Sequence, residues 1–479
     1  MTKKELEKLV RVQAEIINQL QAEIVELKAT VSALQAQLGM NSGNSSKPPS
    51  SDGYKKPPPP PRNTSGRKPG GQPGHKGYGF KLPAKTDEIR RVTRETCWNC
   101  EHNITTEEGT VIGSRYESDI PEIMLRTVRV DKIRVQCPLC GVNNEGDYPE
   151  GINSVYQYGS NLKALATTLV NYGMVSIERT QELLSGLLNT TISQGTIQSM
   201  IYECAIAVKD TVSEICNALI KAPVINNDET GFRVGGKLQW LHSASTDKLT
   251  HIFVHPKRGM DGIEYGGILP QYEGISVHDC WPAYFKFTDC QHALCNAHIL
   301  RELKGIYETT GQEWTQDLIR LLLDLKALVQ WYKFQGSSCF PIESILEYTA
   351  KYDQIINEGL KLNPLSIPDA KKKGRIYKGK PRCLLERLAQ HRDKVLYFIR
   401  DFKVPFDNNQ AERDIRIVKL KHKVSGGART PDGAFAFAQI TSFIQTARKQ
   451  GFSIFFALRS AFHGLLDDFS FASGELTTE

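Results

Sequence analysis

One stretch of the sequence, Val224 to Val234 (VINNDETGFRV), constrains the fold more than any other. It is a short apolar run that ends on a carboxylate, Asp228, and resumes after a turn. This pattern predicts a buried strand that holds an acid rigidly at the edge of a sheet. One carboxylate cannot hold a catalytic divalent ion, so a metal site here needs further acids from later parts of the chain.

Two later segments can supply those acids. Asp279 ends a second apolar run, ISVHD, and Glu412 lies in the helical segment PFDNNQAERDIRIVKLKHK. Asp407 stands where the N-cap of that helix is expected, with Gln410 placed to complete a capping box. Two acids on strands and one on a helix suit two Mg²⁺ or Mn²⁺ ions that activate a water or a 3′ hydroxyl. Either strand acid taken alone is more simply explained as a strand-end or turn acid.

Cations accompany the third acid. Arg416 and Lys419 follow Glu412 at helical spacing, so the acid and both cations share one face. Lys421 comes next, followed by the block SGGART with Arg429, whose two glycines would let backbone amides approach an anion. We therefore expect these cations to position phosphates, and a plain turn before the next helix is the alternative.

The chain resembles the DDE transposases of bacterial insertion sequences in three acidic motifs: NNDETGFRV, SVHDCWPAY and DNNQAERDIRIVKLKHKVSGGART. From the SSKPPSSD block to the GGART block, its order of features is similar to one group of them, the insertion-sequence-sixty-six family, whose large protein is the transposase. The resemblance implies a catalytic core of ribonuclease-H type. It also implies that Asp228, Asp279 and Glu412 are the catalytic acids and the ligands of two Mg²⁺ or Mn²⁺ ions.

The composition sets wider limits. With 479 residues the chain can form roughly two to four domains. Its formal net charge of +7 is too small to indicate a nucleic-acid partner by itself. Eleven cysteines are too few and too scattered for a disulfide framework, and the segment MTKKELEKLVRV lacks the apolar core of a secretion signal. We therefore expect a reducing cytoplasmic compartment, and no membrane span because no apolar run is long enough.

Residues 1–39 are dominated by a heptad pattern. Its core positions alternate by four and three residues without a slip: Leu6, Val10, Gln13, Ile17, Leu20, Ile24, Leu27, Val31, Leu34 and Leu38. One polar core position in so long a pattern predicts a coiled coil and therefore a homo-oligomer. A helix that folds back on its own chain is the alternative, which we favour less because Gly39 and a Pro/Gly tract follow directly.

Residues 40–85 form a basic linker rich in Pro, Gly and Ser, with almost no apolar side chains between Asn41 and Gly79. Such a composition cannot bury enough surface to fold alone, so we expect disorder. Its seven Lys and Arg side chains against the single Asp52 suit contact with a phosphate backbone. A solubilising tether explains the same composition equally well.

Two C-x-x-C pairs indicate a zinc-ribbon domain over residues 86–155. Their cysteines are Cys97, Cys100, Cys137 and Cys140. Four thiolates can surround one Zn²⁺ tetrahedrally, and Gly141 after the second pair allows the tight turn that aims amides at sulfur. The segment between the pairs contains strand-like runs, notably Ile123 to Val135. Because four protein thiolates leave no open position for a water, we expect a structural ion.

Residues 156–220 have helical patterns that fit a helix-turn-helix. The first helix spans 177–188, and Ser193 is expected to cap the second. Three polar side chains at the start of the second helix can face a DNA groove and contact base edges: Gln194, Thr196 and Gln198. An ordinary helical hairpin is the alternative. With the zinc ribbon, this unit would recognise the terminal repeats of the element.

Residues 221–300 form the first part of the core. We expect a helix at 259–269 and further strands at 238–245, 249–255 and 275–279. A cluster with the spacing C-x-H-x-x-C-x-x-H follows: Cys290, His292, Cys295 and His298. It could hold a second Zn²⁺, but a strand running into a helix also produces this spacing by chance, which we favour. The resemblance makes Cys295 and His298 active-site neighbours that shape the pocket, without implying that they bind the catalytic ion.

Residues 301–402 have a helical pattern and postpone the third acid. A helical insertion explains this gap without breaking the sheet. Inside it, the Gly-punctuated loop 369–382 carries cations that suit a nucleic-acid backbone: Lys371, Lys372, Lys373 and Arg375. A solvated loop is the alternative. Residues 403–466 complete the core, and 467–479 form an acidic tail.

These features predict an α+β multidomain protein, with a ribonuclease-H-like core that is interrupted by helices and preceded by a coiled coil, a zinc ribbon and a helix-turn-helix. The resemblance implies cleavage at insertion-sequence ends and joining of the 3′ ends to target DNA, in the bacterial cytoplasm at the nucleoid. It implies terminal inverted repeats, target DNA and accessory proteins of the same element as partners. Two other classes stay open: a sequence-specific DNA-binding regulator with vestigial carboxylates, and a structure-specific nuclease without strand transfer.

Overall fold

The computed structural model describes residues 3–41, 44, 82, 85–106, 109–365 and 378–466. The chain forms two compact units, Met1–Tyr54 with Val130–Glu479 and Lys55–Arg129. The basic loop with Lys371, Lys372, Lys373 and Arg375 lies outside the described residues, as do the acidic tail and most of the linker. Among the helices that are described, none is both long enough and apolar enough to cross a membrane.

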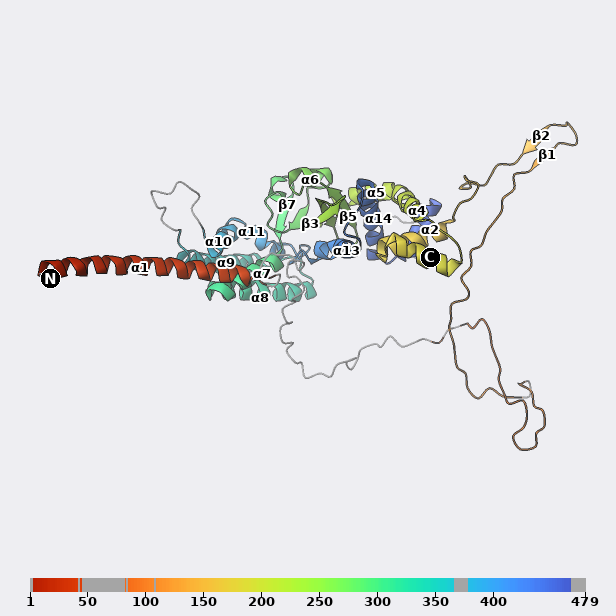
Figure 1. Ribbon diagram of the computed structural model, residues 1–479, viewed down its shortest axis with the longest axis horizontal. Helices are drawn as coiled ribbons and strands as arrows, with labels where there is room; N and C mark the ends of the chain where they lie inside the picture. The colour runs from red at the N-terminus through yellow and green to blue at the C-terminus, as the bar shows by residue number, and fades with distance from the viewer. Residues whose placement is uncertain are drawn as a thin grey trace. The chain divides into compact units, whose positions relative to one another are not determined.

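The larger unit is mixed α/β and contains one sheet of five strands (Figure 1). The strands are β3 Val224–Val234, β4 Lys237–Ser245, β5 Thr250–His255, β6 Ile275–His278 and β7 Gln291–Leu294. Their order across the sheet is β5-β4-β3-β6-β7. The first three are antiparallel neighbours, whereas β6 runs parallel to β3 and β7 runs parallel to β6. The apolar runs of the sequence therefore form strands, and the acid-bearing β3 is the central one. The turn expected directly after Asp228 is wrong, because β3 stays paired with β4 through Asp228 and on to Val234.

A tight turn joins β3 to β4. Val234 pairs with Lys237, which leaves Gly235 and Gly236 as a two-residue loop. Both glycines have positive φ, 56° and 78°. Two-residue hairpin loops of this kind need positive φ at both positions, which glycine adopts without strain.

A first hydrophobic core lies between the antiparallel strands and two C-terminal helices, α13 Asn409–Ser425 and α14 Pro431–Lys449. Its buried side chains include Phe232, Leu241, Ile252, Ile415 and Phe437. Helix α14 packs along the edge strand β5 (Figure 1). Ser442 accepts a hydrogen bond from the Ile252 N–H (2.8 Å), and Thr446 accepts one from the Thr250 N–H (3.0 Å). These hydroxyls satisfy edge-strand donors that would otherwise be buried without partners.

A second hydrophobic core lies between the two parallel strands β6 and β7 and the helices that follow them. These helices are α7 Asn296–Thr310, α8 Trp314–Phe334, α9 Ile342–Leu362, α10 Lys380–Gln390, α11 Arg392–Val395 and α12 Tyr397–Arg400. Val277 of β6 and Leu294 of β7 share one buried cluster with Leu303, Leu318 and Phe398. The helical segment therefore extends the core of the sheet.

Helices also precede the sheet: α2 Ser160–Thr167, the π-helix η3 Thr168–Tyr172, α3 Ile177–Leu188, α4 Gln194–Ala207 and α5 Lys209–Ile220. The cap predicted at Ser193 is confirmed, since its hydroxyl accepts a hydrogen bond from the Thr196 N–H (3.0 Å). Ser176 caps α3 in the same way. Helices α4 and α5 pack against α14, so this region is joined to the first core. The remaining elements are α6 Met260–Tyr265, η4 Leu269–Gln271, η5 Tyr284–Lys286 and α15 Ile454–His463.

The short strands β1 Arg134–Gln136 and β2 Asn143–Glu145 form an antiparallel hairpin around the second C-x-x-C pair. The expectation of strand over Ile123 to Val135 is wrong for most of that segment, because residues 123–133 have no regular secondary structure. A strand needs a neighbour to bond its backbone groups. Strand β2 pairs only with residues 134–136.

Helix α1 spans Lys3–Leu38 without a break. Seven of its predicted coiled-coil core positions are exposed: Ile17, Leu20, Ile24, Leu27, Val31, Leu34 and Leu38. A continuous apolar stripe on one helix therefore stays exposed in the single chain.

Candidate active site

Two of the predicted acids lie on neighbouring parallel strands. Asn226 of β3 pairs with Val277 of β6, so Asp228 and Asp279, each two residues farther on, occupy equivalent positions just beyond the paired residues of these two strands. Burial raises the pKa of both carboxyls, that of Asp228 well above its usual range. Charges on neighbouring acids raise both pKa values further, because like charges oppose each other's ionisation.

The third acid, Glu412, reaches the same region from the first turn of α13. Its charge contributes to the raised pKa of Asp228, so the two carboxylates lie within electrostatic range. Its Oε1 lies 3.2 Å from a guanidinium nitrogen of Arg301 and 3.7 Å from Nδ1 of His298. The structure therefore brings the three acids into one region, with a cation beside the third.

The start of α13 differs from the prediction. The helix begins at Asn409, and the side chain of its N-cap residue, Asn408, makes no capping hydrogen bond. Asp407 accepts a hydrogen bond from the Asn409 N–H (3.2 Å), whereas Gln410 donates to Asp414 and closes no capping box. The predicted cap at Asp407 is wrong by one residue, because the first hydrogen bond of the helix, from the Glu412 N–H to the Asn408 oxygen (3.2 Å), makes Asn408 the N-cap residue.

Asn408 is a buried link between three elements. Its side-chain amide donates to the backbone oxygen of Asn227 (2.7 Å), and its side-chain oxygen accepts from Nδ2 of Asn226 (2.8 Å). Its backbone N–H donates to Sγ of Cys295 (3.1 Å). One residue thus ties the start of α13 to β3 and to the start of α7, and it fixes the position of Glu412 one turn later.

A fourth acid, Glu229, adjoins the site, and no pattern in the sequence predicted a role for it. Its side chain is 2% exposed, and two nitrogens of Arg258 bind it at 2.7 and 2.8 Å. The hydroxyl of Tyr284 donates to its other oxygen (2.5 Å). The guanidinium of Arg258 also lies 4.0 Å from the ring centre of Trp281. The sequence signal that could have identified Glu229 is its place directly after Asp228.

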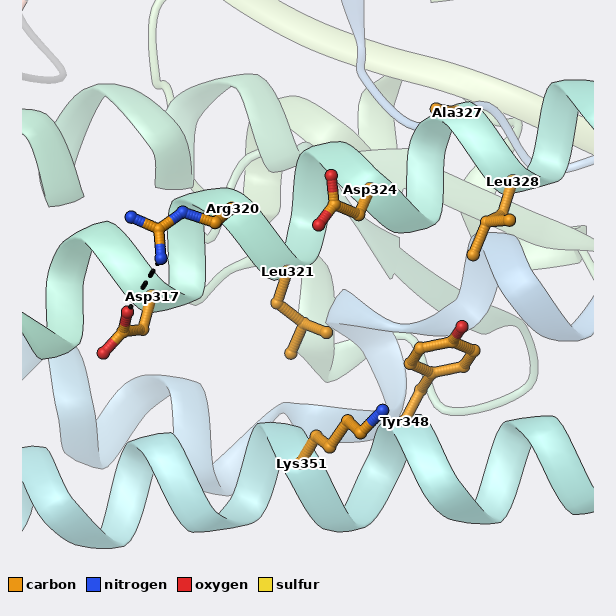
Figure 2. A pocket seen from close by; sticks show the side chains of 8 residues that line it. All are labelled: Asp317, Arg320, Leu321, Asp324, Ala327, Leu328, Tyr348 and Lys351. Carbon is orange, nitrogen blue, oxygen red and sulfur yellow. Dashed lines mark hydrogen bonds and ion pairs between the residues drawn. The ribbon is translucent and has the colours of Figure 1, made fainter.

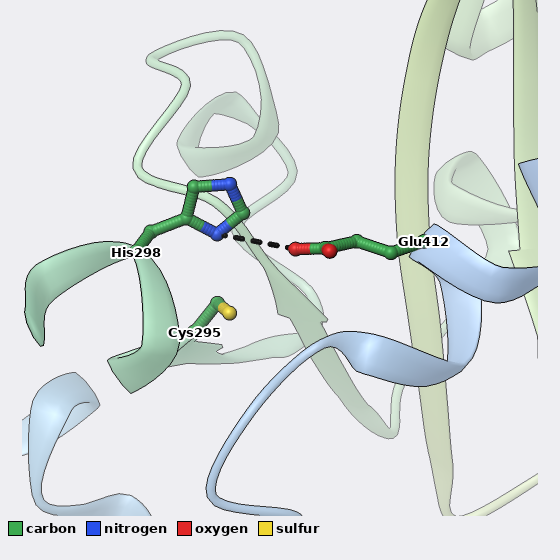
Figure 3. Close-up of side chains that lie close together, drawn as sticks. All are labelled: Cys295, His298 and Glu412. Atoms are coloured by element: carbon green, nitrogen blue, oxygen red, sulfur yellow. Dashed lines mark ion pairs between the residues drawn. The ribbon is translucent and has the colours of Figure 1, made fainter. Parts of the chain in front are cut away.

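The Cys/His cluster divides into two pairs. Cys295 and His298, called the helix pair below, stand at the start of α7. Together with Glu412 they bring one ligand atom each within 4.8 Å of one another, and no other group of three or more His, Cys, Asp or Glu side chains does so in the described part of the chain. Figure 3 shows the His298 ring directed at the Glu412 carboxylate with the Cys295 sulfur beside it. The three acids themselves do not form so tight a group.

Cys290 and His292, called the strand pair below, lie at the start of β7 and make other contacts. His292 Nδ1 lies 3.0 Å from Nε2 of His278, and its Nε2 lies 3.0 Å from the backbone oxygen of Phe287. The Cys290 thiol donates to the same oxygen (3.4 Å). The four residues therefore do not surround one ion. Their spacing reflects a strand that ends at Leu294 and leads into a helix, as expected.

A cavity of about 310 Å³ opens beside Asp279. Trp281 and His298 line it, together with Arg258 and with Arg387 of α10. Both arginines are already paired, Arg258 with Glu229 and Arg387 with Glu302 (2.5 Å). The inserted helices therefore contribute a wall to a nearly neutral space next to the acids.

A larger hollow of about 600 Å³ lies between α8 and α9 (Figure 2). Its lining residues are Asp317, Arg320, Leu321, Asp324, Ala327, Leu328, Tyr348 and Lys351. None of the sheet acids lines it, and Arg320 is paired with Asp317 (3.4 Å). We assign it no role in the chemistry.

The cations predicted to position phosphates have different surroundings. Arg416 and Arg429 are exposed, and Lys419 is half-buried. The Lys421 ammonium lies 5.7 Å from the ring centre of Phe437, and burial lowers its pKa. The two arginines are therefore accessible to a ligand, whereas Lys421 contributes to packing.

The SGGART block pairs with the end of β3 through Ala428. The Ala428 N–H donates to the Arg233 oxygen (2.9 Å), and the Gly235 N–H donates to the Ala428 oxygen (2.9 Å). Gly427 has a φ of 120°, and a Cβ there would lie 2.2 Å from the Arg233 oxygen. Of the two glycines expected to open amides to an anion, Gly426 donates its N–H to the His422 oxygen (2.9 Å) at the end of α13. Contact of an anion with Gly427 stays a prediction.

The predicted base-reading residues lie in the first turns of α4. Gln194 is exposed, and Gln198 is half-buried. The Thr196 hydroxyl lies 2.9 Å from Oγ of Ser193 and takes part in the cap. Contact of these residues with DNA stays a prediction.

Each C-x-x-C pair lies in a tight turn with the same bonding. The Cys97 oxygen accepts from the Glu101 N–H (3.0 Å), and the Cys137 oxygen accepts from the Gly141 N–H (2.9 Å). Glu101 and Gly141 have φ values of 59° and 74°. Backbone N–H groups aimed at sulfur lower the pKa of the Cys97 and Cys137 thiols, which favours the thiolate form that a metal needs. The pairs belong to different compact units, and one ion shared by Cys97, Cys100, Cys137 and Cys140 stays a prediction.

Parts of the chain match known protein families and a curated protein. The Transposase IS66 family matches residues 156–436, which is more than half of the chain. A family of unknown function (DUF6444) matches residues 2–81. The uncharacterized protein y4jO of Sinorhizobium fredii (strain NBRC 101917 / NGR234) is 33% identical over 70 residues, which cover 15% of this chain and 22% of that protein. The chain thus spans about a fifth of the length of this curated relative.

Proposed function

The chain belongs to the IS66 family of transposases, and from this premise we propose that it is a transposase of the DDE type. It binds the ends of its insertion sequence, cleaves the DNA there and joins the freed 3′ ends to target DNA. Both steps are phosphoryl transfers, which need positioned reactants and stabilisation of negative charge more than covalent chemistry by the protein.

The observation that carries this proposal is the convergence of Asp228, Asp279 and Glu412 from two strands and a helix. Clustered, partly buried carboxylates repel one another unless a cation neutralises them, and oxygen ligands are those that Mg²⁺ prefers. Burial is the largest cause of the raised pKa values of Asp228 and Asp279, and the charges of neighbouring acids raise them further. The sheet order, three antiparallel strands followed by two parallel ones, supports a ribonuclease-H-like core.

The residues would divide the work as follows. Asp228, Asp279 and Glu412 would hold two Mg²⁺ ions. Bound ions supply the activation of the attacking water or 3′ hydroxyl and stabilise the leaving oxygen. Arg301, 3.2 Å from Glu412, holds that carboxylate in place. The exposed Arg416, one turn beyond Glu412, steadies the DNA backbone.

Other parts of the chain would bring the DNA ends together. The apolar stripe on α1 supports a coiled coil with a second copy, since an exposed face of this length is covered on association. The turns at the two C-x-x-C pairs support a structural zinc ion. Helices α3 and α4, with Gln194 exposed at the start of α4, support a helix-turn-helix that contacts the terminal repeats.

The test is Mg²⁺-dependent cleavage of DNA that carries an element end. Asp228→Asn, Asp279→Asn and Glu412→Gln should each lower the cleavage rate on the order of 10³-fold, because each removes a charge that acts on the transition state. Binding of the same DNA should not change. The matched control is Asp261→Asn, which alters an exposed acid paired with Lys257 and should cleave like the wild type.

Two outcomes would contradict the proposal. A triple variant that still nicks an element end would show that the acids are not catalytic. A wild type that nicks but never joins ends to target DNA in a strand-transfer assay would be a nuclease, and one that only binds would be a regulator.

A further inference from the structure

The group formed by Cys295, His298 and Glu412 has the chemistry of a second kind of metal site. Its ligand atoms, one sulfur, one nitrogen and one oxygen, lie within 4.8 Å of one another (Figure 3). Magnesium prefers a set made of oxygen alone, whereas thiol and imidazole favour Zn²⁺ and related ions. The same carboxylate can therefore serve two different classes of cation.

The local structure holds two of these ligands in place. Cys295 is the N-cap residue of α7 and His298 lies in its first turn, so helical geometry brings both to one side. The Cys295 sulfur accepts the N–H of Asn408 (3.1 Å), which fixes the position of the sulfur beside the start of α13. Cys295 is 1% exposed, so water does not compete for its sulfur atom.

The His298 ring supplies a free donor atom. Its Nδ1 is buried and has no hydrogen-bond partner, and the Glu412 oxygen that it faces is 3.7 Å away. A buried nitrogen without a partner is costly, and a bound cation would satisfy it.

We propose that Cys295, His298 and Glu412 bind Zn²⁺ or another thiophilic divalent cation, and that the bound ion withdraws Glu412 from the catalytic pair of Mg²⁺ ions. Three protein ligands leave a fourth position open, as in zinc sites that exchange their ligands. Coordination deprotonates the Cys295 thiol, and its proton passes to solvent. The inhibitory half of this inference rests on the proposed function, whereas the binding half does not.

The binding half is tested with Co²⁺ as a spectroscopic probe of the full chain. The wild type is compared with Cys295→Ser, and with Cys290→Ser as the matched control, because Cys290 is a buried thiol of the same segment outside the site. The four predicted ribbon thiols contribute equally to all three proteins and cancel in difference spectra. We expect a thiolate-to-cobalt band in wild type and Cys290→Ser that Cys295→Ser lacks.

A second variant tests the site independently in case Cys295→Ser does not fold. His298 is partly exposed, so His298→Gln should fold, and it should bind the site's Co²⁺ at least about tenfold more weakly. The proposed site would be wrong if the Co²⁺ spectra of the wild type and a folded Cys295→Ser were superimposable. It would also be wrong if His298→Gln bound Co²⁺ as tightly as the wild type.

The inhibitory half is tested by adding Zn²⁺ to Mg²⁺-driven cleavage. Zn²⁺ should slow the wild type and Cys290→Ser at least about tenfold, but should not slow Cys295→Ser relative to its own rate in Mg²⁺ alone. Unchanged wild-type cleavage in Zn²⁺, with Co²⁺ binding intact, would overturn this half. A wild type that cuts no DNA in Mg²⁺ alone would contradict the proposed function, and the Co²⁺ spectra would still decide the site.

Discussion

The strand pair and the helix pair have the same chemistry and lie in one short segment, yet their surroundings are opposite. Cys290 and His292 are buried, and their polar atoms bond to His278 and to a backbone oxygen. Cys295 and His298 border a cavity and face the carboxylate of Glu412. The first pair completes its bonds within the fold, whereas the second retains atoms that can bind a ligand.

The change of secondary structure between the pairs explains this difference. Strand β7 ends at Leu294 and α7 begins at Asn296. Side chains alternate between two faces along a strand, but repeat on one side after three or four residues in a helix. The two pairs follow each other closely in the sequence, but the side chains of the strand pair and those of the helix pair therefore point in different directions. Residue type alone did not decide which pair borders the active site.

The strand pair belongs to a buried network of contacts that ends at Arg258. Substitution of Arg258 should cause the largest loss of stability. His278 stacks on Tyr284 (4.5 Å between ring centres), and Tyr284 binds Glu229, whose charge Arg258 neutralises. Arg258→Met leaves Glu229 charged and unpaired, so the free energy of unfolding should fall by roughly 3 kcal/mol. Urea denaturation measures this loss. The double variant with Glu229→Gln should recover most of it, and a single variant as stable as the wild type would contradict the network.

Alanine at the two histidines compares the pairs directly. His292→Ala removes two buried hydrogen bonds and should lower the free energy of unfolding by about 2 kcal/mol. His298→Ala should lower it by less than about 1 kcal/mol, because Nδ1 has no hydrogen-bond partner to lose. Thermal unfolding of both variants checks the difference. Equal losses would show that the two environments are not distinct.

Asn408 tests how the helix pair is joined to the third acid. Asn408→Ala removes two buried side-chain hydrogen bonds to β3 and should cost about 1–2 kcal/mol of stability. DNA cleavage should fall as well, because the start of α13 positions Glu412. The control is Asn409→Ala, whose side chain makes no hydrogen bond to a described residue. If Asn408→Ala loses stability but cleaves normally, Asn408 does not position Glu412.

The smallest change in stability should come from substitution of Asp228, measured in buffer without divalent cations. The pKa of Asp228 is raised in the folded protein, so its contribution to stability is fully present below about pH 4 and is lost as the pH rises through the folded pKa. At pH 7, Asp228→Asn should therefore be more stable than the wild type by about 1 kcal/mol. The difference should vanish at low pH. Added Mg²⁺ should stabilise only the wild type, since binding to the folded state is lost in the variant. Denaturation curves at several pH values, with and without Mg²⁺, check both expectations.

Local patterns predicted much of the fold and part of the candidate site. The apolar runs around Asp228 and Asp279 form adjacent strands, and Ser193 caps its helix. These features depend on residues close together in the chain, which periodicity and capping chemistry describe well. The predictions of a cap at Asp407 and of a strand over 123–133 were wrong, because both features depend on contacts with residues farther away than a local pattern describes.

By itself, the sequence determined most of the segments that become strands and helices, the acids that accompany the strands β3 and β6, and the stripe of α1 that is apolar. Only the tertiary structure decided that Asn408 bonds to Cys295, that Arg258 pairs with Glu229, and that Glu412 faces the helix pair. The physical reason is the separation along the chain of the residues that interact. Side-chain periodicity records contacts within a few residues, whereas the Asn408–Cys295 bond joins residues 113 positions apart, and only packing brings such residues together.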